Sequence, residues 1–227
     1  MRQLFFFDLC SKNINFAKKR VETMKIICVG WNYRQHNAEM GRTEQPKSPV
    51  IFLKPDSALL KGNKPFFIPD FSSQIEYEAE LVFKISRLGK NIAEKFAHRY
   101  YSEVALGIDF TARDLQQQAR QNGTPWEISK GFDGAAVVSN FIPLQEFDNQ
   151  KNINFSLLKN GQKVQSGNSS DMIFPIDTII SYVSTFFTLK TGDLIFTGAP
   201  AGVGKVEIGD KIIGFLEEKE MLNFKIC

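Results

Sequence analysis

The sequence has few of the residues that mark several common kinds of site. Only three cysteines occur among 227 residues, and no two have CxxC spacing. An odd number of scattered cysteines predicts no disulfide framework, and the lack of zinc-type Cys/His spacing argues against a zinc site. Such cysteine usage is typical of a reducing compartment, so we expect a cytoplasmic protein.

Long apolar runs and strongly basic stretches are also missing. No segment approaches the roughly 20 apolar residues that cross a bilayer, and the run at residues 4–7 is followed at once by Asp8. The densest basic run is only residues 18–20, and the net charge is +3. We therefore expect neither a membrane partner nor a nucleic-acid partner.

Short strand-like segments dominate from Met24 onward. Asn160-Gly161 predicts a hairpin, because both central residues of a type I′ turn need positive φ. Helices are predicted over residues 111–122, with Thr111 as candidate N-cap and Gly123 as the stop, and over 175–187. The predicted strands cover residues 25–30, 50–54, 66–69, 75–85, 104–109, 154–159, 162–165, 194–197, 211–216 and 221–226. We therefore expect one mixed α/β, mostly β domain over residues 24–227, preceded by an N-terminal extension of unknown role at residues 1–23.

The most informative stretch lies within the predicted strand 75–85. Alternate side chains of a strand share a face, so Glu76, Glu78 and Glu80 point the same way. Burying unpaired carboxylates is costly, so either a cation lies beside them or this face is solvated. Oxygen ligands favour Mg²⁺, Mn²⁺ or Ca²⁺ over Zn²⁺. Asp109, at the end of an apolar strand, is a further candidate for a residue of the site. Its alternative role is to place a negative charge at the N-terminus of the following helix.

The chain contains only two histidines. His98 lies in a basic segment and is predicted to be solvated. His36 and Glu39 are i,i+3 neighbours and can touch if their segment is helical. A carboxylate beside an imidazole orients the ring and raises its basicity, as in a general base. Surface ion pairs share this spacing, so the pair alone leaves a surface role open.

These residues belong to a series of motifs that occur in a familiar order. The resemblance to the fumarylacetoacetate hydrolase family covers residues 25–226, nearly the whole chain. It implies a fumarylacetoacetase C-terminal-domain-like β-roll or barrel with a few peripheral helices, usually a homodimer. The motifs are Val29-Gly30-Trp31-Asn32-Tyr33, His36-x-x-Glu39-Met40, Phe52-Leu53-Lys54-Pro55, Glu78-Ala79-Glu80-Leu81, Asp109-Phe110-Thr111-Ala112-Arg113-Asp114, Lys130-Gly131-Phe132-Asp133, Met172-Ile173-Phe174 and Gly192-Asp193-Leu194-Ile195-Phe196-Thr197-Gly198.

The resemblance also implies roles for individual residues and leaves Glu76 outside the metal's ligands. It implies Glu78, Glu80 and Asp109 as ligands of Mg²⁺ or Mn²⁺, His36 and Glu39 as the dyad that activates water, Lys130 as a charge partner, and Arg113 and Gln116 as residues that face the ligand or support the site.

One departure from the family pattern bears on the substrate. The family often has Thr-Gly-Thr-Pro where this chain has Thr197-Gly198-Ala199-Pro200. The missing hydroxyl removes a hydrogen bond worth about 1 kcal/mol. Backbone N–H groups of this glycine-rich loop can still bind a carboxylate, which makes Gly198 and Ala199 candidate substrate contacts.

The function implied by the resemblance is a metal-dependent hydrolase that cleaves a carbon–carbon bond in acylpyruvates through a pyruvate enolate. The His36–Glu39 pair favours hydrolysis, because hydrolysis needs activated water. The same enolate serves an oxaloacetate decarboxylase or a 2-hydroxyhepta-2,4-diene-1,7-dioate isomerase. A non-catalytic keto-acid binding protein is the alternative outside enzymes, and a purely structural acidic strand would bind no metal.

Overall fold

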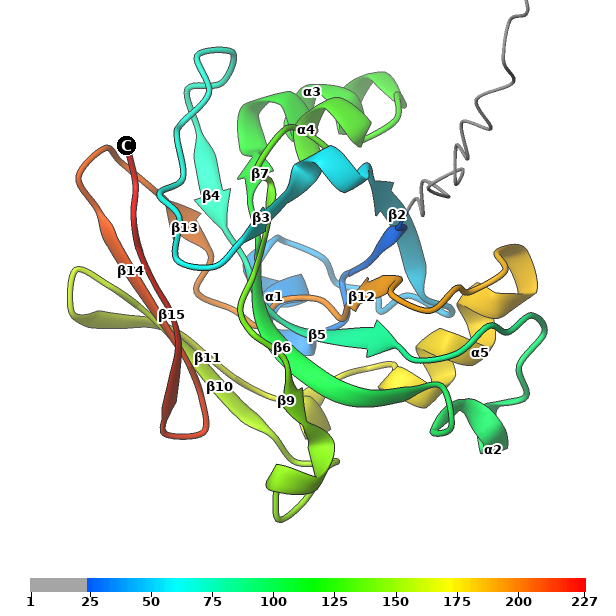
Figure 1. The fold of residues 1–227 in the computed structure, drawn as a ribbon. Coiled ribbons are helices and arrows are strands. Elements are labelled where there is room, and N and C mark those ends of the chain that lie inside the picture. The colour runs from blue at the N-terminus through cyan, green and yellow to red at the C-terminus, as the bar shows by residue number, and fades with distance from the viewer. Residues whose placement is uncertain (1–23) are drawn as a thin grey trace, which may run out of the picture.

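An eight-stranded sheet runs through the middle of the molecule and curls around itself (Figure 1). The computed structural model describes residues 24–227, so the predicted N-terminal extension lies outside the described residues. The sheet has the order β2-β1-β12-β5-β6-β8-β3, with β9 paired to β6. Its strands are β1 (Ile26–Gly30), β2 (Val50–Lys54), β3 (Leu59–Lys61), β5 (Ala79–Ile85), β6 (Tyr101–Asp109), β8 (Ala136–Val138), β9 (Ile142–Pro143) and β12 (Leu194–Phe196).

Two smaller sheets complete the β-structure. A four-stranded sheet, β11-β10-β14-β15, stands beside the large sheet on the left of Figure 1, and a three-stranded sheet, β13-β4-β7, lies above it. Their strands are β4 (Ile75–Tyr77), β7 (Thr111–Ala112), β10 (Asn154–Lys159), β11 (Gln162–Asn168), β13 (Gly204–Lys205), β14 (Lys211–Leu216) and β15 (Lys219–Lys225). The mostly β fold class that the sequence predicts is confirmed.

The helices lie at the periphery, as expected. α5 packs Ile179, Ile180 and Val183 against β1 and β12, next to α2, while α3 and α4 lie together at the opposite end (Figure 1). Gly123 ends α3 with φ of 66°, the left-handed conformation that favours glycine at this position. The helices are α1 (Arg34–Glu39), α2 (Glu94–Ala97), α3 (Arg113–Asn122), α4 (Glu127–Lys130) and α5 (Ile176–Phe186), with 3₁₀ turns at Asp56–Ala58, Leu144–Glu146 and Ser169–Asp171.

The alternation of side chains along β5 divides the core into separate layers. Leu81 and Phe83 pack into the core that includes the four-stranded sheet. Val82 points the other way, into the interior of the curl, where it packs with Cys28 and Phe196. Glu80 has the same parity as Val82, so the strand directs its carboxylate into the curl.

Three details of the predicted elements are wrong. The strand 75–85 is interrupted at Glu78, which separates β4 from β5. Residues 66–69 form no strand, only an isolated bridge at Phe66, because the flanking prolines lack the N–H that a ladder requires. Helix α3 begins at Arg113, not after Thr111, because Thr111 is paired within β7.

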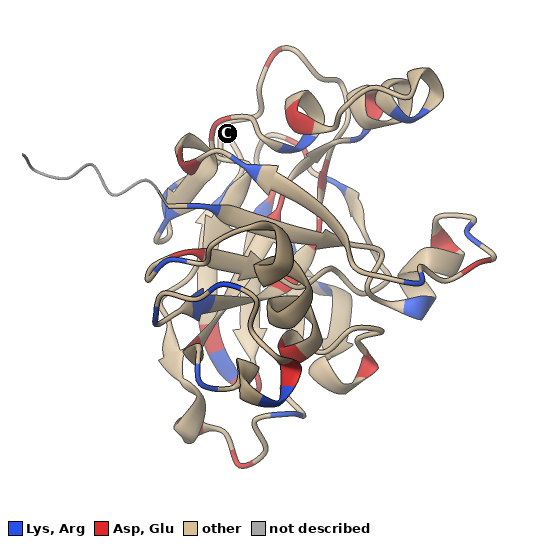
Figure 2. Ribbon diagram, turned by 90° about the vertical axis from the view of Figure 1, so that its right-hand side faces the viewer, with Lys and Arg blue, Asp and Glu red and all other residues tan. Residues whose placement is uncertain are grey.

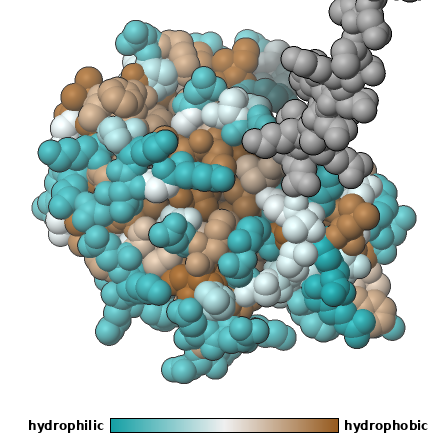
Figure 3. All heavy atoms as spheres, viewed as in Figure 1, coloured by the Kyte–Doolittle hydropathy of each residue, from teal (hydrophilic) through white to brown (hydrophobic). Residues whose placement is uncertain are grey.

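The predicted hairpin is confirmed, with φ of 53° at Asn160 and 82° at Gly161. Its second strand runs on to Asn168. Charged residues of both signs are interspersed along the ribbon (Figure 2). The face in Figure 3 likewise mixes hydrophilic and hydrophobic residues. Within residues 24–227, no helix combines the length and apolar character needed to cross a membrane.

Candidate active site

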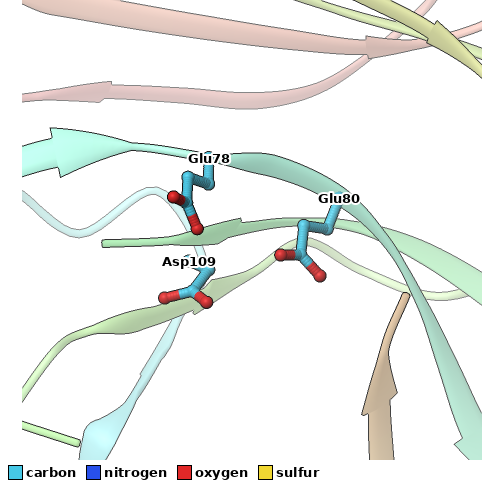
Figure 4. A group of neighbouring side chains, drawn as sticks. All are labelled: Glu78, Glu80 and Asp109. Atoms are coloured by element: carbon cyan, nitrogen blue, oxygen red, sulfur yellow. The ribbon is translucent and has the colours of Figure 1, made fainter. Parts of the chain in front are cut away.

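Three carboxylates converge at one end of the curled sheet (Figure 4). Glu78 lies at the junction of β4 and β5, Glu80 lies on β5, and Asp109 ends β6. All three are buried, and one oxygen of each lies within 4.8 Å of the others. This carboxylate triad is the arrangement that the sequence predicts for a metal site.

The backbone of two neighbouring strands brings the triad together. The amide of Asp109 donates a hydrogen bond of 2.8 Å to the carbonyl of Glu78. Glu80 is paired with Gly107 across the β5–β6 ladder. A Cβ at Gly107 would come within 2.5 Å of the Val82 side chain, so only glycine fits beside Glu80 at this register.

Lys130 contacts two members of the triad. Its Nζ donates to Glu78 Oε2 at 2.6 Å, to Asp109 Oδ2 at 2.9 Å and to Thr111 Oγ1 at 2.6 Å. The three donors of the ammonium group are therefore all engaged. Lys130 lies in the site as predicted, and its contacts position the carboxylates.

Arg113 supports the triad from the first turn of α3. Its Nη2 donates to Glu78 Oε1 at 2.6 Å, its Nε to Glu76 Oε2 at 2.6 Å, and its Nη1 to Gln116 Oε1 at 2.5 Å. Burial favours protonation of Glu78, but Lys130 and Arg113 outweigh burial and hold the pKa of this carboxyl below its ordinary value. Glu76 is thus tied to Arg113.

Glu80 has a different environment from Glu78. Its Oε2 accepts a hydrogen bond of 2.7 Å from the amide of Gly198, and no lysine or arginine of residues 24–227 forms an ion pair with it. Burial and the carboxylates of Asp109 and Glu78 raise the pKa of Glu80 well above its ordinary value. A divalent cation between the three carboxylates would remove this repulsion.

The donor set fits a hard divalent cation. Asp109 Oδ1 is buried and accepts no hydrogen bond of good geometry from the described residues, although Lys54 Nζ lies 2.7 Å away. Carboxylate oxygens without nitrogen or sulfur ligands suit Mg²⁺ or Mn²⁺.

His36 and Glu39 lie on α1, as the predicted helical turn requires. His36 Nδ1 lies 3.2 Å from Glu39 Oε2, and the His36 ring is buried while Glu39 is partly exposed. Glu39 also accepts a hydrogen bond of 3.0 Å from the amide of Gly202. The contact anchors the dyad to the loop after β12. By contrast, His98 is exposed, as predicted.

A small cavity joins these groups. Its free volume is about 30 Å³, room for roughly two water molecules. One wall is aromatic, with the Trp31 and Trp126 ring centroids 5.3 Å apart and Phe52 beside Trp126. Its polar lining consists of His36, Glu78, Glu80, Asp109, Arg113, Gln116, Arg120 and Lys130.

A family model described as fumarylacetoacetate (FAA) hydrolase C-terminal matches residues 25–224. The chain belongs to the fumarylacetoacetate hydrolase family. A mitochondrial oxaloacetate decarboxylase of Dictyostelium discoideum is 43% identical over 189 residues, covering 83% of this chain and 86% of the relative. An oxaloacetate tautomerase of Escherichia coli is 39% identical with the same coverage of both chains. The crystal structure of a Pseudomonas aeruginosa fumarylpyruvate hydrolase in complex with Mn²⁺ and pyruvate is 33% identical, with a TM-score of 0.84 and coverage of 89% of this chain and 88% of that chain.

In this member of the family, the loop after β12 has a supporting role. Gly198 has φ of 96°, and a Cβ there would lie 2.8 Å from the Asn32 Cβ. Because its amide donates to Glu80, the Gly198 N–H is engaged by the triad rather than free for a substrate. Ala199 lines the cavity and is buried, where its methyl group replaces the hydroxyl of the common family pattern.

Sequence reasoning missed Lys54. This side chain is fully buried, 2.7 Å from Asp109 Oδ1, and donates to the carbonyl oxygens of Lys130 and Ala135. Phe52 and Lys54 share one face of β2 by the period-2 rule, and Phe52 lines the cavity. A lysine on the inward parity of an apolar strand is the signal that could have found it.

Proposed function

We propose that this chain is a divalent-metal-dependent enzyme that interconverts the keto and enol forms of oxaloacetate. The observation that carries the proposal is that His36, a group able to move a proton, lines the same cavity as the carboxylate triad. Relatives named as an oxaloacetate tautomerase and an oxaloacetate decarboxylase support oxaloacetate as the substrate.

Glu78, Glu80 and Asp109 would hold Mg²⁺ or Mn²⁺. When bound, the cation would polarise the carbonyl next to the substrate's C1 carboxylate and acidify the adjacent C–H. The Mn²⁺ in the Pseudomonas aeruginosa relative supports this choice of metal class.

The residues of this chain would handle the proton. His36 accepts a proton from C3 of oxaloacetate, and Glu39, 3.2 Å from Nδ1, stabilises the imidazolium that results. The imidazolium then donates the same proton to the 2-oxygen, so the enol forms with no net gain or loss of protons. The aromatic wall of Trp31 and Trp126 limits the access of water, which protects the enolate.

Hydrolysis of acylpyruvates is the second candidate. The contact between Glu39 and His36 favours it, because a carboxylate-supported imidazole can also deprotonate water. The fumarylpyruvate hydrolase among the structural relatives supports the same reaction. Decarboxylation of oxaloacetate uses the same enolate and is therefore an outcome of the same assay.

The test is an assay of purified protein with oxaloacetate and with acetylpyruvate, each with Mg²⁺, with Mn²⁺ and with EDTA. Enol absorbance and pyruvate release are followed together. Metal-dependent conversion between enol and keto oxaloacetate without release of pyruvate supports the tautomerase. Release of pyruvate from oxaloacetate supports a decarboxylase, and release of pyruvate from acetylpyruvate supports the hydrolase. Turnover that persists in EDTA, or no turnover of either acid, contradicts the proposal.

The homodimer and the cytoplasmic location remain predictions. The family resemblance leads us to expect a particle of twice the 25.8 kDa of one chain. Light scattering on the eluting protein measures this mass, and a mass of one chain would contradict the dimer. Fractionation of cells that express the full chain tests the location.

A further inference from the structure

A second hollow adjoins the cavity along α3. Its volume is about 520 Å³, far larger than the cavity beside the triad. Both spaces are lined by Met40, Arg113, Gln116 and Arg120, so the hollow opens onto the site. Gln117 and Gln121 complete its polar lining. A substrate anchored at the triad would extend its far end into this space.

The spacing along α3 places three polar residues on one face. Arg113, Gln116 and Arg120 are separated by three and four residues, which is the spacing of neighbours on a helix. Arg113 already donates hydrogen bonds to Gln116 and to two glutamates of the site, Glu76 and Glu78. Arg120 is one turn farther out and exposed, at the junction of the cavity and the hollow.

Arg120 is also the uncommitted cation of this lining. Lys130 and Arg113 are paired with carboxylates of the triad and of Glu76, whereas no carboxylate in residues 24–227 forms an ion pair with Arg120. The aromatic side chains of Trp31, Phe52 and Trp126, which also line the cavity, carry no charge. A planar guanidinium flanked by amides is well suited to a carboxylate.

We propose that Arg120 binds the distal carboxylate of a dicarboxylic 2-keto acid and so selects such acids over monocarboxylic ones. The inference rests on the proposed function, in which the C1 carboxylate and keto group are held at the triad. Selection then depends on charge at the far end of the substrate. Oxaloacetate carries this second carboxylate, and acetylpyruvate and pyruvate do not.

The experiment compares Arg120→Gln and Arg120→Lys with the unmodified protein and with Arg99→Gln, a matched exposed arginine outside both spaces. Calorimetry on Mg²⁺-loaded protein measures the dissociation constants of oxaloacetate and of pyruvate. Steady-state kinetics give kcat/KM for oxaloacetate and for acetylpyruvate.

We expect Arg120→Gln to weaken oxaloacetate binding about tenfold or more, the scale of a charge-assisted hydrogen bond. Pyruvate affinity should stay within about twofold, because no partner of its single carboxylate is lost. Arg120→Lys should recover part of the preference, and Arg99→Gln should match the unmodified protein. Unfolding midpoints equal to that of the unmodified protein show that the exposed substitutions leave the fold intact.

The two proposals fail in different ways. If the loaded protein binds neither oxaloacetate nor pyruvate, the proposed function is wrong and the inference falls with it. If the protein binds both acids and Arg120→Gln leaves their ratio unchanged, or weakens both equally, only the role of Arg120 is wrong.

Discussion

Glu80 is the member of the triad that no cationic side chain of residues 24–227 contacts. We expect Glu80→Gln to lower Mn²⁺ affinity by more than the roughly 10–100-fold that loss of a partner outside the ligand set costs. Titration with Mn²⁺ followed by electron paramagnetic resonance measures this affinity. Glu76→Gln is the control, because Glu76 is bonded to Arg113 and Gln74 and lies outside the triad. Equal losses in both variants would contradict the assignment of the ligands.

Lys54 lies at the same site, and we expect it to contribute to the stability of the folded state. Its removal in Lys54→Met leaves the buried carboxylate of Asp109 with Lys130 as its one remaining cation among the described residues. Breaking a buried pair from one side costs about 3–5 kcal/mol, measured as the free energy of unfolding in urea without metal. The exposed Lys61→Met on β3 is the control. A change in Lys54→Met no larger than in this control would show that Asp109 needs no cation besides Lys130.

At the scale of the element, α3 is held in place by Asp114 in its first turn. This carboxylate accepts hydrogen bonds from the Ser72 hydroxyl at 2.6 Å, the Ser73 amide at 2.8 Å and the Leu115 amide at 2.8 Å. Burial opposes ionisation of Asp114, but these hydrogen bonds outweigh it and lower the pKa of the carboxyl. The helix that carries Arg113 and Arg120 is thereby joined to the loop before β4.

Asp114→Ala should therefore lower the free energy of unfolding by about 1–2 kcal/mol at neutral pH. Because the pKa is lower in the folded state, this contribution is present above the ordinary Asp value of about 3.9 and is lost as pH falls through the folded pKa. Urea unfolding at about pH 6 and about pH 3 should show the difference between the two proteins shrinking. A constant difference would mean that the ionised carboxylate is not its source.

At the scale of the whole molecule, the triad couples metal binding to folding, because its three ligands meet only when β5 and β6 are paired. A ligand at about 100 times its Kd stabilises the folded state by about 2.7 kcal/mol. For a domain of this size, that corresponds to a rise in Tm of roughly 5–10 °C. Thermal unfolding with Mn²⁺ and with EDTA measures the shift. The shift should vanish in Glu80→Gln, and its persistence there would point to a different binding site.

Local patterns in the sequence were enough to predict the parts of the site that depend on spacing. The period of two on a strand predicts that Glu78 and Glu80 share a face, and Asn160-Gly161 predicts the hairpin turn. The contact between His36 and Glu39 follows from the i,i+3 spacing on a helix. Each of these depends only on residues that are neighbours in the chain, so backbone geometry alone determines the outcome.

The remaining features were decided by tertiary structure. Lys54 reaches Asp109, Arg113 reaches Glu78, and the amide of Gly198 reaches Glu80 across long stretches of sequence. No local period encodes these contacts, because they arise from the curl of the large sheet and from the packing of α3 beside β7 and α4. The sequence by itself determined which carboxylates share a face of the strand. The tertiary structure decided which cations accompany them and which arginine of the cavity lining has no carboxylate partner within residues 24–227, because burial requires each charge to find its partner wherever the fold brings one.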